Sequence, residues 1–234
     1  MAFWKERVER SVRSVLDDGS RLQAPAVAKY VDKMRRAHPD ETPAQIIARM
    51  EKLFLIAVTG SGTAVGAAAA APGVGTAASL AAAGAETAFF LEASALLTLA
   101  VASVHGIAPT DDENRRALVL AVALGDSGMD IVERTVGHSA KNWGTLLTNR
   151  IPGIGSMNDN LLKKFITRFV AKRAALMAGK IIPAGIGAVI GGAGNRVLGK
   201  GVIANSHKAF GPPPAHWPAK QLLIEPDPQP SIES

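Results

Sequence analysis

The sequence of 234 residues contains no cysteine and few aromatic residues. The absence of cysteine excludes a disulfide framework, a thiolate nucleophile and a zinc–thiolate site, and it fits a reducing cytoplasm. Aromatic residues make up 5% of the chain, whereas 47% is hydrophobic and 23 residues are glycine. The apolar residues are therefore largely alanine, valine, leucine and isoleucine. This composition favours helices that cross closely at small residues.

Charge is also absent from a long stretch of the chain. No charged residue occurs from Leu53 to Ala85, and the continuation to residue 107 adds only Glu86 and Glu92. Residues 150–208, in contrast, hold ten bases and a single acid. The net charge of +6 therefore belongs mainly to one segment, which we expect to face an anionic surface. The charged start of the chain argues against a secretory signal peptide.

Helical periodicity with no competing strand pattern predicts an all-α fold. We expect a multi-helix bundle with a central apolar, Gly/Ala-rich helical hairpin, Pro-Gly corners and a disordered, extended Pro-rich C-terminal tail. The chain divides into N-terminal amphipathic helices (1–50), a helical domain (51–210) and the tail (211–234). The expected helices span residues 3–17, 26–37, 43–71, 76–107, 110 to about 137, 158–180 and 186–204.

Local signals place several of these helix ends and contacts. Thr42 is expected to be an N-cap, with Pro43 at the first helical position. Gly62, Gly66 and Ala70 have the small-xxx-small spacing that brings helices close together. Residues 53–71 are about long enough to span a bilayer core. Residues 117–124 are apolar on every face, which predicts central burial.

Three corners in which a proline accompanies a Gly-x-Gly break the helical runs. We interpret them as helix punctuation, because the sequence lacks the Gly-Lys-Ser/Thr of a phosphate loop and the strand that precedes a dinucleotide-binding turn. The residues of these structural corners are Pro72, Gly73, Gly75, Pro152, Gly153, Gly155, Pro183, Gly185 and Gly187.

The helix expected over 158–180 has an apolar face beside a basic stripe. A basic amphipathic helix binds well to an anionic membrane surface. The alternative is an ordinary surface helix that packs its apolar face on the core. Nucleic acid is disfavoured because no aromatic residues interleave the bases and no reading motif is present. The lipid-contact candidates are Lys163, Lys164, Arg168, Lys172 and Arg173.

Two isolated carboxylates, Glu86 and Glu92, are the ligand-binding candidates. They are six residues apart and point about 120° from each other around a helix, so they cannot jointly chelate one ion without ligands from other helices. The simplest interpretation is that each carboxylate pairs with a base on a neighbouring helix, such as Arg115, Arg116 or Arg196. The alternative is a proton relay, or an ion or ligand site within a helical core.

A second acidic group consists of Asp126, Asp130 and Glu133, which share one helix face. This stripe could bind a divalent cation, but a solvated face or a pairing surface for the basic helix is the preferred interpretation. The Glu-x-x-His spacing of a di-iron bundle is missing, and no nucleophile elbow accompanies any histidine. We therefore predict no metal site, no cofactor and no catalytic residue.

Several short motifs follow one another in the segments 72–76, 84–87, 104–106, 182–195 and 209–210. Their order resembles that of the EcsC family of bacterial proteins, in which a proline-glycine corner leads into a long helix that ends near a glycine, and a later corner leads into a glycine-rich helix with an asparagine. The resemblance covers roughly residues 50–210. It implies membrane association without an established activity. A protein partner, an ABC transporter, is implied by this resemblance alone.

These observations lead to a hypothesis about function. We expect a non-enzymatic, membrane-associated helical protein of the EcsC type on the cytoplasmic side of a bacterial membrane, supporting a membrane or transport process. It would be peripheral or inserted through the hairpin 53–107, with an anionic membrane surface as partner. Alternatives are a soluble protein that binds an apolar small molecule in its Gly/Ala-lined core, and a metal-assisted hydrolase that uses the acidic stripe.

Overall fold

The computed structural model describes residues 26–70, 76–107, 118–119, 121–123, 167, 171 and 186–218. Within these residues no strand occurs, and the regular structure is helical, as predicted. A helix over 26–37 precedes three long helices, which are α2 (Pro43–Ala70), α3 (Thr76–Val104) and α8 (Ile186–Phe210). Residues 118–119 and 121–123 are also helical.

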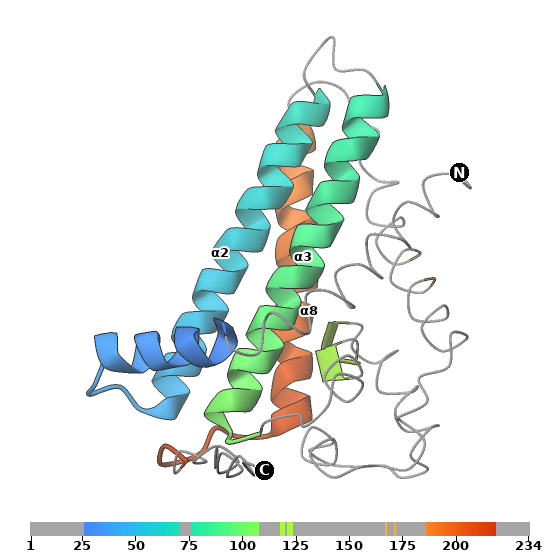
Figure 1. The fold of residues 1–234 in the computed structure, drawn as a ribbon. Helices are drawn as coiled ribbons and strands as arrows, with labels where there is room; N and C mark the ends of the chain where they lie inside the picture. Colours follow the sequence, from blue (N-terminus) through green and yellow to red (C-terminus); the bar gives the residue numbers. More distant parts are fainter. Residues whose placement is uncertain are drawn as a thin grey trace, which may run out of the picture.

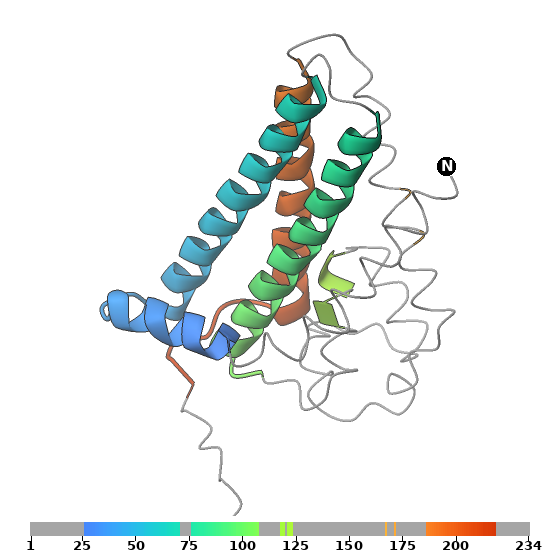
Figure 2. The same cartoon turned by 45° about the horizontal axis from the view of Figure 1, so that its top comes forward.

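The three long helices form a bundle in which α8 runs parallel to α3 and antiparallel to α2 (Figure 1). The most extensive contact joins α2 to α8, although well over a hundred residues separate them in the chain. Helix α3 lies against both, with more of its contact on α2. The helix over 26–37 lies across the bundle beside the start of α2, and Figure 2 shows the same arrangement from a second direction.

The start of α2 confirms the predicted cap. Thr42 is the N-cap and Pro43 is the first helical residue. The backbone N–H of Gln45 donates to Thr42 Oγ1 at 3.3 Å, and the backbone N–H of Thr42 donates to Gln45 Oε1 at 2.8 Å. This reciprocal pair is a capping box, in which two N–H groups that the helix leaves unpaired are satisfied.

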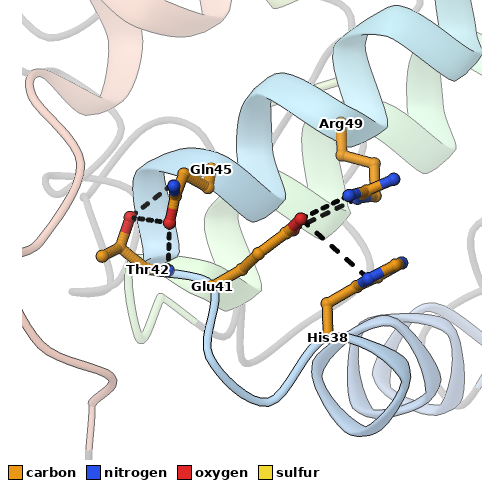
Figure 3. Close-up of polar contacts among 5 residues, drawn as sticks. All are labelled: His38, Glu41, Thr42, Gln45 and Arg49. Carbon is orange, nitrogen blue, oxygen red and sulfur yellow. Dashed lines mark hydrogen bonds and ion pairs between the residues drawn. The ribbon is translucent and has the colours of Figure 1, made fainter.

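An ion-pair cluster holds the turn between the helix over 26–37 and α2 (Figure 3). The Arg49 guanidinium donates to both carboxylate oxygens of Glu41, with 3.1 Å from Nε to Oε2. His38 Nδ1 lies 3.9 Å from Glu41 Oε1. The hydrogen bond from Arg49 lowers the pKa of Glu41, and the same bond raises the pKa of Arg49.

Helix α3 ends at a glycine, as predicted. Gly106 has a φ of 73°, and the backbone N–H of Ile107 donates to the Ala102 carbonyl at 2.9 Å while that of Gly106 donates to Ser103 at 3.0 Å. These are the two hydrogen bonds of a Schellman motif, which requires a left-handed residue that glycine adopts without strain.

The end of α8 differs from the prediction. The helix continues six residues beyond Ala204 and ends at Phe210, followed by Gly211 with a φ of 75°. The N–H of Gly211 donates to the His207 carbonyl at 2.9 Å, and Pro212 cannot continue the helix. Residues 205–210 contain neither glycine nor proline, so the helix continues to Phe210 and ends at Gly211 and Pro212.

The C-terminal segment 211–218 corrects the expectation of a disordered tail for these residues. It is non-helical, as expected, but it packs against the body of the protein. Trp217 is partly buried against the core, and the Arg35 guanidinium lies 4.8 Å from the centre of its ring. Pro218 lies against Gly106, where an added Cβ would be 3.0 Å from the proline Cβ. Residues 219–234 lie outside the described residues.

Bulky side chains fill the core about half-way along α2 and α3. The rings of Phe54 and Phe90 are 6.3 Å apart between centroids, and both side chains are buried. In the apolar block 117–124, Leu118, Val119, Ala121 and Val122 are buried, as predicted, and Ala123 is partly buried. Asn205 Nδ2 on α8 donates to the Val122 carbonyl at 3.1 Å and ties that segment to the bundle.

Candidate functional site

Glycines bring α2 and α8 into direct backbone contact. A Cβ added to Gly62 would lie 2.5 Å from the Gly191 carbonyl oxygen, and one added to Gly191 would lie 2.2 Å from the Gly62 oxygen and 3.4 Å from Gly66 Cα. Gly192 faces Thr63 in the same way, with 2.3 Å from an added Cβ to Thr63 Oγ1. The predicted small-residue spacing is confirmed for Gly62 and Gly66. The glycines at this interface accommodate a neighbouring helix.

A buried polar layer joins all three helices directly below this contact. Asn195 on α8 donates from Nδ2 to the Val58 carbonyl on α2 at 2.8 Å, and it also contacts Glu86 Oε1 on α3. Asn195 and Glu86 are only 3% and 5% exposed. Buried polar groups are stable when they are hydrogen-bonded. We call Val58, Glu86 and Asn195 the polar layer.

The structure separates the two ligand-binding candidates. Glu86 lies in the polar layer, whereas Glu92 is exposed. On α8 the hydrogen-bond partner of Glu86 is Asn195 and not the adjacent Arg196, whereas Arg115 and Arg116 lie outside the described residues. Arg196 points away from the layer because one residue along a helix turns the side chain by about 100°, and its side chain is exposed.

An open groove runs between α2 and α8 on the outer side of the bundle, with a volume of about 530 Å³. Three exposed bases line it, namely Lys52 on α2 and Arg196 and Lys200 on α8. Within the described part of the chain, none of the three forms an ion pair. Bulky apolar side chains also line it: Leu55, Ile56 and Ile203. We call this feature the basic groove.

One carboxylate, that of Glu51, also lines the basic groove. Its Oε1 lies 2.5 Å from Nε2 of His207, so a hydrogen bond occupies this oxygen. Glu51 and His207 also border a second hollow, of about 380 Å³, which extends past Ala48 to Pro212 and Pro213. The three bases therefore leave the groove with an excess of positive charge.

On the side of the polar layer where Gly62 meets Gly191, the helices α2, α3 and α8 contain no charged residue. We define the uncharged end as residues 60–70 of α2, 76–85 of α3 and 186–194 of α8, which lie together in both ribbon views (Figures 1 and 2). Glu86 and Arg196 are the first charged residues after this end on α3 and α8. Because Glu86 contacts Asn195, those first charges occur at one level of the bundle.

Exposed bulky apolar side chains surround this boundary, one on each helix. Ile56, Phe89 and Val197 are 58%, 41% and 63% exposed. Each lies within three residues of a member of the polar layer, which corresponds to less than one helical turn. The boundary of the uncharged end therefore combines exposed apolar groups with the exposed bases of the basic groove.

One helical segment in the described part of the chain is long and apolar enough to cross a membrane. It is Gly84–Val104, with 21 residues and a mean hydropathy of 1.8, and 67% of the window is buried inside the protein. This segment begins at the polar layer and continues away from the uncharged end. Its hydropathy is therefore largely that of a core helix.

Many residues singled out from the sequence lie outside the described residues. These include the lipid-contact candidates Lys163, Lys164, Arg168, Lys172 and Arg173, the acidic stripe, Arg115, Arg116 and every corner residue except Gly187. Gly187 lies in the first turn of α8. For the first corner, the helix boundaries agree with the predicted break in the helix, because α2 ends before Pro72 and α3 begins after Gly75.

No known protein family, curated protein or solved structure matches this chain in the comparisons made. The site is therefore interpreted from its own residues. Within the described residues, no group of three or more metal-ligating side chains could hold a metal ion.

Sequence reasoning missed the basic groove. Lys52 and Lys200 are separated by nearly 150 residues, and each looks like an ordinary surface base in its own helix. The usable signal was Asn195 followed by Arg196, a polar pair in an otherwise glycine-rich helix. Only the pairing of α2 with α8 brings the three bases together.

Proposed function

We propose that this protein is a non-enzymatic, membrane-associated helical protein that attaches to the cytoplasmic face of a membrane through its uncharged end. The observation that supports this most is the segregation of charge along the bundle. Three helices from distant parts of the chain place their uncharged ends together. The first charges on α3 and α8, Glu86 and Arg196, follow at a common level, and the first charge on α2 is Lys52. The EcsC-like order of motifs is compatible with the same assignment.

The dimensions favour insertion into one leaflet. The uncharged end comprises nine to eleven residues of each helix, which corresponds to about 15 Å at a rise of about 1.5 Å per residue. A bilayer core is about 30 Å thick, so this depth is about half of it. Spanning by Gly84–Val104 would require that segment to leave the protein core, in which two thirds of it is buried.

The composition also predicts which lipids the protein needs for attachment. Alanine and glycine contribute little transfer free energy, so the uncharged end alone should bind weakly. Exposed Ile56, Phe89 and Val197 add apolar area at the boundary, and nearby bases add about 1 kcal/mol each at an anionic surface. We therefore expect attachment to depend on anionic lipid and to weaken at high salt.

The absence of cysteine makes a site-specific test simple. An environment-sensitive fluorophore is attached to Ala67→Cys, an exposed position in the uncharged end, or to Ala28→Cys, an exposed position in the helix over 26–37. With vesicles containing phosphatidylglycerol, the position-67 probe should shift to the blue and gain intensity, while the position-28 probe should not.

Equal responses at both positions would contradict attachment by the uncharged end. Failure of the unlabelled protein to float with anionic vesicles at low salt would contradict the proposed function as a whole. Extraction by a high-salt or carbonate wash separates surface attachment from stable insertion.

A further inference from the structure

We propose that the basic groove is a binding site for the phosphate group of an anionic phospholipid. This inference rests on the proposed membrane attachment and adds a specific headgroup site to it. The groove belongs to the α2–α8 interface, whereas the lipid-contact residues expected from the sequence lie on a different segment, 158–180.

The charge of the groove selects an anion. Lys52, Arg196 and Lys200 converge on one hollow from two helices, and none forms an ion pair within the described residues. Among the described residues of the lining, Glu51 is the one acid, and its Oε1 lies 2.5 Å from Nε2 of His207. A guanidinium with two ammonium groups is a donor set that matches phosphate oxygens, since arginine can bind bidentately and lysine acts as a point charge.

The position of the groove and its apolar lining select a lipid as the source of that phosphate. Arg196 directly follows Asn195 of the polar layer, and Lys52 directly precedes the uncharged stretch of α2. The bases therefore lie where headgroups would be if the uncharged end entered the hydrocarbon. Leu55, Ile56 and Ile203 line the same groove, and they can contact an acyl chain, which a free phosphate lacks.

The first experiment compares vesicle binding of two triple variants of the full chain. The groove variant is Lys52→Gln, Arg196→Gln and Lys200→Gln, and the control is Lys29→Gln, Lys33→Gln and Arg36→Gln, which removes the same charge from exposed positions on the helix over 26–37. We expect the groove variant to bind phosphatidylglycerol vesicles on the order of 100-fold more weakly, since each base near the surface contributes a factor of about five. The control should change the affinity by less than about threefold because its positions lie beyond a Debye length from the membrane.

The second experiment identifies the ligand by calorimetric titration with soluble compounds. Dihexanoyl phosphatidylglycerol, below its micelle concentration, should bind the wild type and the control variant at one saturable site and should not bind the groove variant. Dihexanoyl phosphatidylcholine and glycerol phosphate should bind at least tenfold more weakly. Equal binding of glycerol phosphate would overturn the lipid assignment in favour of a free phosphate site.

The outcomes separate this inference from the proposed function. If the wild type floats with anionic vesicles and the groove variant floats equally well, the groove inference is wrong and membrane attachment stands. If the wild type binds neither vesicles nor the short-chain lipid, both proposals are wrong. A groove variant that binds lipid normally but loses association with another protein would assign the groove to an acidic protein surface. All substituted side chains are exposed, so far-ultraviolet circular dichroism should show unchanged folding.

Discussion

The two ends of the three-helix bundle are held together by different kinds of contact. In the uncharged end, α2 and α8 touch through glycines, and the closest atoms belong to the backbone. Beyond the polar layer, in the part of the bundle that we call the base, bulky side chains fill the space between the helices, beginning with Phe54 and Phe90 one helical turn from the layer. The polar layer of Val58, Glu86 and Asn195 lies between these two regions.

This difference shows that hydropathy and exposure to lipid need not coincide. The one described helical segment that is long and apolar enough to cross a membrane, Gly84–Val104, lies mostly in the base and is largely buried in the protein. The uncharged end is less apolar per residue, but it lacks charge on all three helices. A bundle with this division can keep its most apolar helix buried in the protein core and place a less apolar but uncharged end against the membrane.

The largest expected effect comes from damage to the base. Phe90→Ala removes a ring that is 1% exposed and packs against Phe54. We expect a loss of about 3–5 kcal/mol in the free energy of unfolding, which combines lost burial with a residual cavity. Phe89→Ala is the matched control, because its neighbouring ring is 41% exposed and should change stability by less than about 1 kcal/mol. Urea denaturation followed by circular dichroism measures both, and equal losses would contradict the assigned core.

A smaller effect is expected from the uncharged end. Gly62→Ala places a Cβ 2.5 Å from the Gly191 oxygen and 2.7 Å from Asn195 Nδ2, so α2 and α8 must separate and the polar layer must shift. We expect a loss of about 1–3 kcal/mol. Gly60→Ala, two residues away, meets no atom within 4 Å and should gain about 0.5–1 kcal/mol from the better helix propensity of alanine. Thermal unfolding should therefore move in opposite directions, and a shift of the same sign would refute the close α2–α8 crossing.

The smallest effect concerns the turn at the base, where Glu41 pairs with Arg49 (Figure 3). The hydrogen bond from Arg49 lowers the pKa of Glu41 below its ordinary value of 4.5. The stabilisation is therefore present above pH 4.5 and is lost as the pH falls through the lowered pKa. The difference in Tm between the wild type and Glu41→Gln should be constant near neutral pH and should shrink in acid. A difference that grows as the pH falls would contradict this pairing.

Local signals explain how much of the fold was predictable. The helix over 26–37, the cap at Thr42, the start of α3 and its stop at Gly106 all depend on residues within one or two turns of each feature. The stop of α8 was also encoded locally, in Gly211 and Pro212, but these residues had been assigned to the tail. The segment 211–218 was misjudged because proline-rich composition predicts disorder, whereas Trp217 and Pro218 pack on Arg35 and Gly106, which are remote in sequence.

The candidate site was only partly predictable. The sequence singled out Glu86 because a lone carboxylate in an apolar helix requires a partner. It did not identify that partner, since Asn195 is 109 residues away and an arginine directly follows it. The sequence offered only the Asn195–Arg196 pair as a signal for the basic groove and could not assemble it, because two of the bases lie on α8 and the third lies on α2.

The sequence by itself determined an all-helical chain, the glycine spacing for close crossings and a long stretch without charge, because helix propensity, capping and composition act over short distances. The tertiary structure alone decided that α8 packs antiparallel to α2, which side chain meets Glu86 and which bases share a groove. Those outcomes depend on which helix surfaces fit one another, and shape complementarity between distant segments is not written in any local pattern.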